Sequence, residues 1–201
     1  MGSSGNMGRR YMAILKLLGI RHDGYDLGGD LDTGAQYSHI VIATPTTTHI
    51  QVIKDCLEVW PKAFILCEKP VSKDIFEILS LKRSYNVSKL FMVNNYAYML
   101  SMNPIRVGTD ETRYNYFKTG GDGLFWDCIQ LIYMAKGSIE LKAEAPHWKV
   151  HLNGLELTSN MVDFSYIDMI ADFTGARQHC WGFDDIIKAH EAVIKELVSQ
   201  K

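Results

Sequence analysis

Two glycines near the start of the chain have the spacing of a phosphate-binding turn. Gly5 and Gly8 match the second and third glycines of the pattern G-x-G-x-x-G, and Ser3 takes the place of the first. In such a turn, backbone N–H groups and the positive end of the following helix bind a pyrophosphate, and the glycines allow its close approach. The predicted contacts are Ser3, Ser4, Gly5, Asn6, Met7 and Gly8. The alternative is that residues 1–5 form a flexible leader or a tag remnant in front of a helix.

An acidic residue follows at the distance expected for recognition of an adenosine ribose. Asp26 lies eighteen residues beyond Gly8, close to the usual offset in dinucleotide-binding folds. A carboxylate there accepts hydrogen bonds from the ribose 2′-OH and repels a 2′-phosphate, so it favours NAD over NADP. The alternative is a turn aspartate in front of Gly28-Gly29.

Polar residues also follow two apolar runs, 40–43 and 63–67, with a predicted helix between them at 47–59. Apolar runs of this length that alternate with a helix are typical of a parallel sheet covered on both faces. Open sheets of this kind bind their ligands at the carboxyl ends of the strands. We therefore expect a binding cleft at Ala43, Thr44, Pro45, His49, Glu68, Lys69 and Pro70.

The remaining elements of the first ninety-odd residues continue the alternation. The pattern predicts helices at 9–18 and 71–86, the second capped by Ser72, and strands at 20–25 and 90–93. This order is typical of a doubly wound α/β domain. A strand normally precedes the glycine turn at the centre of such a sheet, yet only Met1 stands before Gly2. Either the chain lacks residues that its fold requires, or another segment fills the gap.

The character of the sequence changes after about position 95. Helices are predicted at 125–135, 161–173 and 183–198, and alternation around Asn153-Gly154 predicts a hairpin within 147–157. The domain assignment is therefore a Rossmann-type domain at 1–94, followed by a small α+β domain at 95–201. We expect the C-terminal helix of the second to pack back on the first.

Composition excludes several classes of protein. The formal net charge is −2 and no basic stripe is present, so no nucleic-acid partner is expected. No apolar run approaches the length that spans a bilayer, so no membrane partner is expected. The cysteines Cys56, Cys67, Cys128 and Cys180 form no C-x-x-C motif, and the histidines have no metal-binding spacing. We expect free thiols, no metal site and a cytoplasmic location.

Several of these motifs together resemble the glucose-fructose oxidoreductase and inositol dehydrogenase family, Gfo/Idh/MocA. The segments are SGNMGRRY, ATPTTTH, ILCEKP and GGDGLFWDCIQLIYMAKG, and the likeness covers roughly residues 3–137. The resemblance implies a Rossmann-type nicotinamide-binding domain and a second domain with a mainly antiparallel sheet. It also implies a sugar or polyol substrate and a homodimer or other homo-oligomer.

The resemblance also assigns roles to individual residues. Thr44, Pro45 and His49 would line the nicotinamide half of the cleft, while Glu68 and Lys69 would reach the nicotinamide ribose and the substrate hydroxyl. A lysine there can place positive charge beside a developing alkoxide and relay its proton. The alternative for Lys69 is a surface lysine before a turn.

The sequence departs from the family pattern in its second half. Asp127 matches an aspartate that is usually followed, four residues on, by a catalytic histidine, but Leu131 stands there. Gln130 can orient a substrate by hydrogen bonds but cannot exchange a proton near neutral pH. Three alternatives stay open: Asp127 acts alone, Lys69 is the only proton carrier, or the chain is a non-catalytic nucleotide- or partner-binding protein. Asp127 could equally cap a helix.

Overall fold

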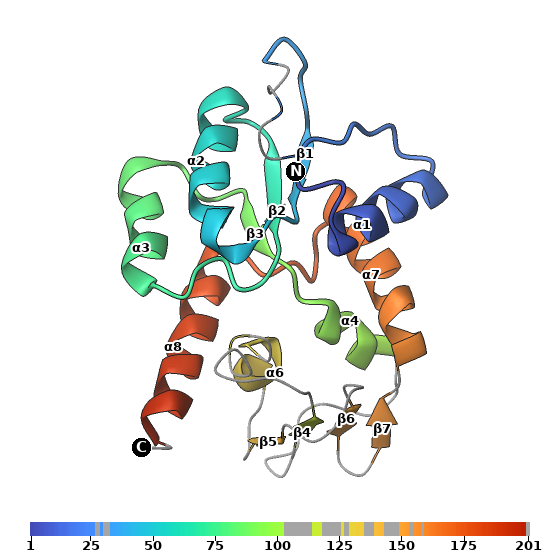
Figure 1. Ribbon diagram of the computed structural model, residues 1–201, viewed down its shortest axis with the longest axis vertical. Helices are drawn as coiled ribbons and strands as arrows, with labels where there is room; N and C mark the ends of the chain where they lie inside the picture. Colours follow the sequence, from blue (N-terminus) through green and yellow to red (C-terminus); the bar gives the residue numbers. More distant parts are fainter. Residues whose placement is uncertain are drawn as a thin grey trace. The chain divides into compact units, whose positions relative to one another are not determined.

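The computed structural model describes residues 1–26, 29, 33–102, 114–117, 126, 129–134, 139–142, 149–152, 155–157 and 159–199. The chain divides into two compact units (Figure 1). Unit 1 consists of Met1–Val93 and Ile170–Ile187, and unit 2 consists of Asn94–Met169 and Lys188–Lys201. No helix in the described part of the chain is long and apolar enough to cross a membrane.

Unit 1 is built on a parallel three-stranded sheet, as predicted. Strands β1 (His39–Ile42), β2 (Phe64–Cys67) and β3 (Leu90–Met92) lie in that order. Helix α2 (His49–Val59), preceded by the short 3₁₀ helix η1 (Thr46–Thr48), and helix α3 (Ile75–Ser84) make the two crossovers. Because the three strands are parallel, their carboxyl ends all lie at the same edge of the sheet.

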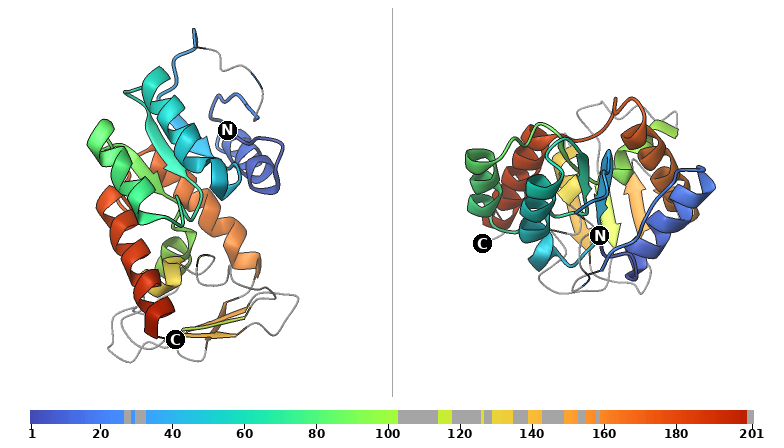
Figure 2. Two further views of the ribbon diagram at one scale, coloured as in Figure 1. Left: turned by 60° about the vertical axis from the view of Figure 1, so that its left-hand side comes forward. Right: turned by 90° about the horizontal axis from the view of Figure 1, so that it is seen from above.

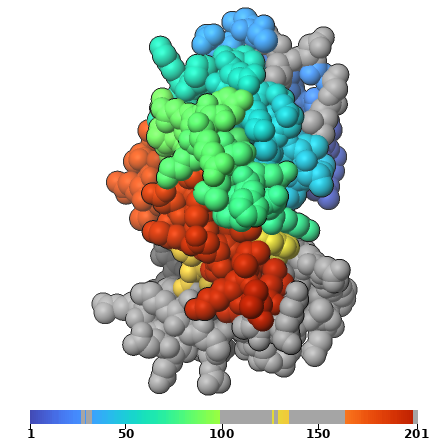
Figure 3. Space-filling model, turned by 90° about the vertical axis from the view of Figure 1, so that its left-hand side faces the viewer, coloured from blue at the N-terminus to red at the C-terminus, as the bar shows by residue number. Residues whose placement is uncertain are grey.

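The two faces of this sheet are covered differently. The face toward α2 and α3, which lie together in Figure 3, carries Ile40, Ile42, Ile65, Cys67, Leu90 and Met92, all buried. On the other face, the Phe173 ring meets His39 and Phe91 edge-on, with ring centroids 5.2 and 6.1 Å apart. The Arg177 guanidinium lies 3.9 Å above the Phe64 ring. Both faces are thus covered, as the continuous apolar runs require.

Helix α1 (Asn6–Leu17) begins three residues earlier than predicted. It lies on the opposite side of the sheet from α2 and α3 (Figure 2). It buries Gly8, Tyr11 and Ile14, and Gly19, at φ +68°, turns the chain away.

Two local predictions in unit 1 are wrong. Residues 20–25 are extended but form no strand, because no described strand lies beside them to complete a ladder. The N-cap of α3 is Asp74, whose Oδ1 accepts from the Phe76 N–H at 2.8 Å. Ser72 instead binds the Asp74 amide and the Glu77 carboxylate, so the helix begins at Ile75.

Met1 occupies the position beside β1 where a strand was expected. Its amine donates to the Val41 carbonyl at 2.9 Å, and its carbonyl accepts from the Ala43 amide at 2.9 Å. The next amides, of Gly2 and Ser3, donate to the Tyr25 carbonyl. Among the described residues, no segment continues this pairing along β1.

Unit 2 contains a four-stranded sheet that is mainly antiparallel. Its order is β5 (Ile139–Lys142), β4 (Tyr114–Phe117), β6 (Lys149–Leu152) and β7 (Leu155–Leu157). Only β4 and β5 are parallel, and Leu152 pairs with Leu155, which confirms the predicted hairpin. Helices α4 (Asn95–Met102) and α6 (Ile129–Met134) lie within the unit, while α7 (Ser159–Thr174) and α8 (Phe183–Ser199) each contribute to both units. The sequence did not predict α4, β4 or β5.

Candidate functional site

The glycine turn is closed by two contacts that leave no room for side chains. Gly2 has φ +76°, and a Cβ there would lie 2.7 Å from the Ala43 carbonyl oxygen. A Cβ on Gly8 would lie 1.9 Å from the Gly2 carbonyl oxygen. Sequence reasoning placed Ser3 in the first glycine position, but Gly2 is the residue whose conformation requires glycine. The spacing Gly2, Gly5, Gly8 was the signal that could have shown this.

Gly5 differs from these two glycines. It is exposed at the N-cap of α1, and a Cβ there would make only ordinary contact, 3.5 Å from the Gly2 carbonyl oxygen. Among the described residues, no contact therefore requires glycine at this position. The absence of a side chain there leaves the first turn of α1 open to close approach.

Asp26 is bound directly to the glycine turn. Its carboxylate accepts from the Ser3 hydroxyl at 3.0 Å, from the Ser4 amide at 3.1 and 3.2 Å, and from the Ser4 hydroxyl. The hydrogen bonds from Ser4 and Ser3 lower the pKa of Asp26 below its usual value. A carboxylate has about four acceptor positions, so room remains on Oδ1 for another donor. Residues that the sequence predicted as cofactor contacts are here brought together.

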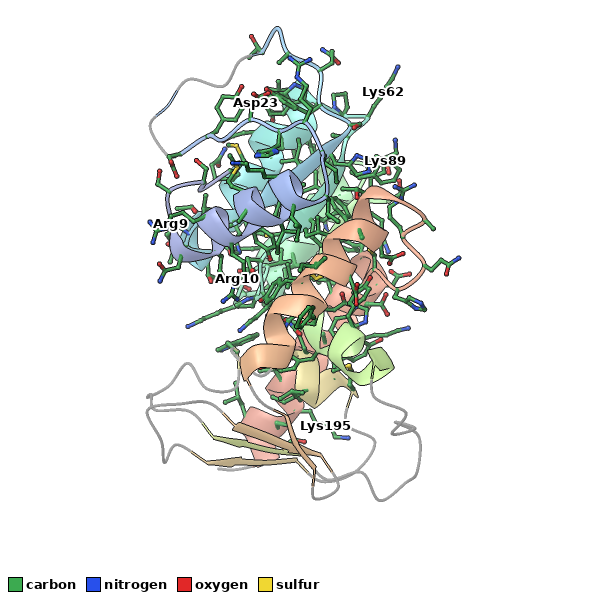
Figure 4. The ribbon with its side chains drawn as sticks, turned by 90° about the vertical axis from the view of Figure 1, so that its right-hand side faces the viewer. Arg9, Arg10, Asp23, Lys62, Lys89 and Lys195 are labelled. Atoms are coloured by element: carbon green, nitrogen blue, oxygen red, sulfur yellow. The ribbon has the colours of Figure 1, made fainter. Side chains whose placement is uncertain are left out.

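A positive charge accompanies the turn. The Arg9 guanidinium donates to the Ser4 carbonyl at 2.6 Å and to Oδ1 of Asn6 at 2.7 Å. Arg9 is exposed on α1, as the labelled side chains in Figure 4 show. Together with the amino end of α1, this guanidinium favours an anion beside the turn. Sequence reasoning included Arg9 only within the resemblance and gave it no role. Met7 is half-buried, and its sulfur lies 3.9 Å from the Arg10 guanidinium.

The residues after β1 show two different environments. Thr44 is 7% exposed, and among the described residues its hydroxyl has no hydrogen-bond partner. A buried hydroxyl destabilises the folded state unless it forms a hydrogen bond. Pro45 is exposed at the start of η1, and Ala43 is half-buried beside Met1.

His49 ties the two strand ends together. Its Nδ1 lies 2.9 Å from the Pro70 carbonyl, and its Nε2 lies 2.8 Å from the Thr44 carbonyl. The ring is 1% exposed. The prediction that His49 lines the cofactor cleft stays a prediction, and this geometry shows that the ring also holds Thr44 and the turn after β2 in position.

Glu68 and Lys69 occupy the carboxyl end of β2. Glu68 is buried, and its Oε1 accepts from the Tyr11 hydroxyl at 2.5 Å while Oε2 faces the Lys69 amide at 3.2 Å. Lys69 is half-buried and is followed by Pro70 through a cis peptide bond. Glu68 therefore joins β2 to α1, and Lys69 lies at the strand end where the sequence predicted it.

The two other predicted catalytic residues belong to unit 2. Gln130 is fully buried in α6, and its Oε1 accepts from the Tyr96 amide at 3.3 Å. Its amide nitrogen has no partner among the described residues. Asp127 lies outside the described residues. In the described part of the chain, no group of three histidine, cysteine or acidic residues could hold a metal ion.

Comparison with known proteins finds solved structures that share this fold. No protein-family model matches the sequence, and no curated protein does. A myo-inositol dehydrogenase from Corynebacterium glutamicum shares the fold with a TM-score of 0.65 and 17% identity, over 81% of this chain and 77% of that one. A Gfo/Idh/MocA family oxidoreductase from Vibrio cholerae gives 0.61 and 11%, over 94% and 86%.

A third solved structure contains a cofactor. It is a 3-ketoreductase from Actinomadura kijaniata in complex with NADP, with a TM-score of 0.50 and 11% identity, over 93% of this chain and 84% of that one. At these identities the likeness concerns the fold, and it agrees with the architecture that the resemblance implied.

Proposed function

We propose that this chain is a nicotinamide-dependent oxidoreductase of the Gfo/Idh/MocA type, acting on a hydroxyl or carbonyl of a sugar or polyol. The observation that carries the proposal is the glycine turn closed against Asp26, beside the carboxyl ends of two parallel strands. Ligands of open α/β sheets bind at that edge. The solved structures with the same fold include an inositol dehydrogenase and a ketoreductase with bound NADP.

The residues present suit a dinucleotide. The first turn of α1 and the Arg9 guanidinium supply donors and positive charge for the pyrophosphate. Asp26 retains an acceptor position for the adenosine ribose and disfavours a 2′-phosphate, so NAD is preferred to NADP. The hydroxyl of Thr44, which has no partner among the described residues, can hydrogen-bond the nicotinamide half. The bound nicotinamide supplies or accepts the hydride.

Lys69 is the residue to which we assign proton transfer. Its ammonium can donate to a carbonyl oxygen of the substrate or stabilise the alkoxide of a hydroxyl that loses hydride. Glu68, held by Tyr11, fixes the strand end that carries this lysine. Asp127 and Gln130 remain proposed contributors to substrate orientation from unit 2.

A second candidate is a nucleotide-binding protein without turnover. The complete burial of Gln130, whose carbonyl oxygen is already bound to the Tyr96 amide, favours it. A glutamine that is buried in unit 2 and already hydrogen-bonded there is less free to orient a substrate.

Cofactor binding is tested by titrating the protein with NADH and with NADPH while the fluorescence of its four tryptophans is followed. We expect saturation with NADH at lower concentration. Gly5→Ala should weaken binding at least about tenfold, equivalent to about 1.4 kcal/mol, without lowering the melting temperature. Gly182→Ala is the matched control, because a Cβ there meets nothing within 4 Å. Binding of neither nucleotide by the folded protein would contradict the proposal.

Turnover is tested on a panel of sugars, polyols and nucleotide-linked sugars by absorbance of the reduced cofactor. We expect Lys69→Ala to lower kcat by about a hundredfold or more, the usual contribution of a positioned proton carrier. Unchanged turnover in Lys69→Ala would remove the assigned role. Cofactor binding without turnover on any member of the panel would favour the second candidate.

A further inference from the structure

The segment that joins α7 to α8 is attached to the sheet of unit 1. We call this segment, residues 175–182, the strap (Figure 1). Near its far end, the Trp181 carbonyl accepts from the Met92 amide of β3 at 2.9 Å. Near its start, the Arg177 guanidinium lies 3.9 Å above the Phe64 ring of β2. Both contacts hold the strap against the sheet.

The last turn of α7 fixes the backbone of the strap. The Asp172 carboxylate accepts from the amides of Gln178 and His179, both at 3.0 Å. The Asp172 carbonyl accepts from the Arg177 amide at 2.8 Å. Arg177 has a φ of +56°, in the left-handed region that residues with a Cβ rarely adopt. The backbone that carries the Arg177 side chain is therefore held in place by hydrogen bonds to α7.

The Arg177 side chain meets His39, the first residue of β1. Nη1 of the guanidinium lies 3.3 Å from Nε2 of the imidazole, and it also donates to the Phe173 carbonyl at 3.3 Å. A guanidinium can only donate, so Nε2 is the accepting, unprotonated nitrogen. The proton of the neutral ring then lies on Nδ1, which is 3.0 Å from the Ser38 hydroxyl oxygen. The contact therefore requires His39 to be neutral and in one tautomer.

Protonation of His39 would reverse this contact from attraction to repulsion. A proton on Nε2 places two N–H groups and two positive charges against each other. Water has limited access to the new charge, because the imidazole is stacked on Phe64 and meets Phe173 edge-on, with ring centroids 5.3 and 5.2 Å apart. Burial, and after it the Arg177 charge, lower the pKa of His39 below its usual value. The folded arrangement therefore favours the neutral ring.

The other charges around His39 give it no acidic partner. Lys89 adds a further positive charge, with Nζ 4.7 Å above the Phe64 ring. The cavity that His39 lines also carries groups that are charged or titrate near neutral pH, namely the Met1 amine, Arg21, His22 and Asp23. In the described part of the chain, no acidic side chain forms a hydrogen bond or ion pair with His39. Nothing described would thus offset the repulsion by Arg177.

We propose that His39 and Arg177 form a pH-sensitive latch, which holds the strap on the sheet while His39 is neutral and releases it when His39 is protonated. Release begins at Arg177, because its guanidinium can leave Phe64 and enter water. The latch is fully closed above the ordinary histidine pKa of about 6.5. It opens as the pH falls through the lower folded value. Because residues 170–187 are the part of the chain that returns to unit 1, the latch controls how firmly that return is attached.

Amide hydrogen exchange followed by mass spectrometry tests the latch on the 201-residue chain at about pH 7.5 and about pH 5, on either side of the histidine range. Protection factors are compared, because they remove the intrinsic effect of pH on exchange. We expect peptides from the strap to lose protection at least about tenfold at the lower pH, the effect of losing a charged hydrogen bond. Helix α2 should keep its protection. Unchanged protection in the strap, or an equal loss in α2, would overturn the proposal.

Matched substitutions of two half-buried histidines identify the titrating group. His39→Gln keeps an acceptor but takes up no proton, so protection of the strap should no longer depend on pH. His22 is the control, since its Nδ1 lies 2.7 Å from the Ile20 carbonyl and not beside the strap. His22→Gln should keep the full response. A response that persists in His39→Gln, or that disappears in His22→Gln, would contradict the assignment and would exclude His39 as the switch.

The role of Arg177 is tested by a titration of the histidine ring signals by NMR. Arg177→Met removes the charge but keeps an extended side chain. Because the Arg177 charge lowers the pKa of His39, we expect that pKa to rise in the variant. The exchange of the strap should also become less dependent on pH. An equal pKa of His39 in the two proteins would show that the imidazole and the guanidinium do not interact, and the latch would be refuted.

Discussion

Tyr11 donates a hydrogen bond of 2.5 Å to Oε1 of Glu68, and this bond joins α1 to the carboxyl end of β2. Both residues are buried, at 2% and 8% exposure. The glycine turn lies at the start of α1, and Lys69 directly follows Glu68. One contact between residues 57 positions apart therefore relates the proposed cofactor turn to the proposed proton carrier.

Removal of the Tyr11 hydroxyl should destabilise unit 1. Tyr11→Phe keeps the ring but leaves a buried carboxylate oxygen without its donor, so we expect the free energy of unfolding to fall by about 1.5–3 kcal/mol. Urea denaturation measures this change. Tyr85→Phe removes a tyrosine–glutamate bond at the surface, to Glu58, and should cost less than about 1 kcal/mol. Equal losses in both variants would contradict the assigned importance of the buried bond.

Gly8→Ala should disturb the turn itself. The new Cβ would lie 1.9 Å from the Gly2 carbonyl oxygen, a backbone atom that cannot rotate away. We expect stability to fall by about 1–3 kcal/mol, as for other overpacked sites, and nucleotide binding to fall with it. Thermal denaturation and the NADH titration report the two effects. Gly5→Ala, by contrast, should affect binding alone, so similar melting temperatures for the two variants would be inconsistent with the geometry.

His49 should be important for stability because its two ring nitrogens lie against two carbonyl groups in a buried place. His49→Phe removes the partners of the Thr44 and Pro70 carbonyls in a buried place, so we expect a loss of about 2 kcal/mol or more. His22, half-buried with one bond to the Ile20 carbonyl, provides a control. If His22→Phe costs as much in chemical denaturation, the bridge between the strand ends is not the cause.

Asp26 should set cofactor preference. Asp26→Ala removes the carboxylate that disfavours a 2′-phosphate, so the ratio of NADPH to NADH dissociation constants should fall by about tenfold or more. Parallel fluorescence titrations measure the ratio. An unchanged ratio would show that the carboxylate serves only to close the turn.

Asp26 should also contribute to the dependence of stability on pH. Its hydrogen bonds lower its pKa in the folded chain, so its stabilising contribution is fully present above the ordinary carboxyl pKa of about 3.9. The contribution is lost as the pH falls through the lower folded value. Acid denaturation of Asp26→Asn should lack this component, and identical acid transitions in the two proteins would contradict it.

The cysteines should differ in reactivity. Burial raises the pKa of the Cys56 thiol to about 12, and burial also raises the pKa of Cys67. Cys180 is half-exposed. Of the three cysteines that the structure describes, we expect a maleimide at pH 8 to label Cys180 first and to reach Cys56 and Cys67 only in denaturant, because the thiolate is the nucleophile. Peptide mass spectrometry identifies the labelled residues. Early labelling of Cys56 would contradict its burial.

The sequence by itself determined the parts of this protein that depend on local pattern. Continuous apolar runs at β1 and β2, separated by an amphipathic helix, required a covered parallel sheet. Asn153-Gly154 between alternating residues predicted the hairpin of β6 and β7. Two glycines at a helix start and an acidic residue at the usual offset predicted a single binding region, and Asp26 accepts hydrogen bonds from Ser3 and Ser4 of the glycine turn.

Only the tertiary structure decided which side chains are held by hydrogen bonds to distant parts of the chain. His49 was predicted at the cleft, but its two carbonyl partners are separated from it along the chain, by 5 and 21 positions. The bond of Tyr11 to Glu68 and the requirement for glycine at position 2 likewise depend on contacts with distant backbone. Residues 20–25 carry the composition of a strand, yet form none, because a strand exists only when a neighbour supplies the other half of each hydrogen bond.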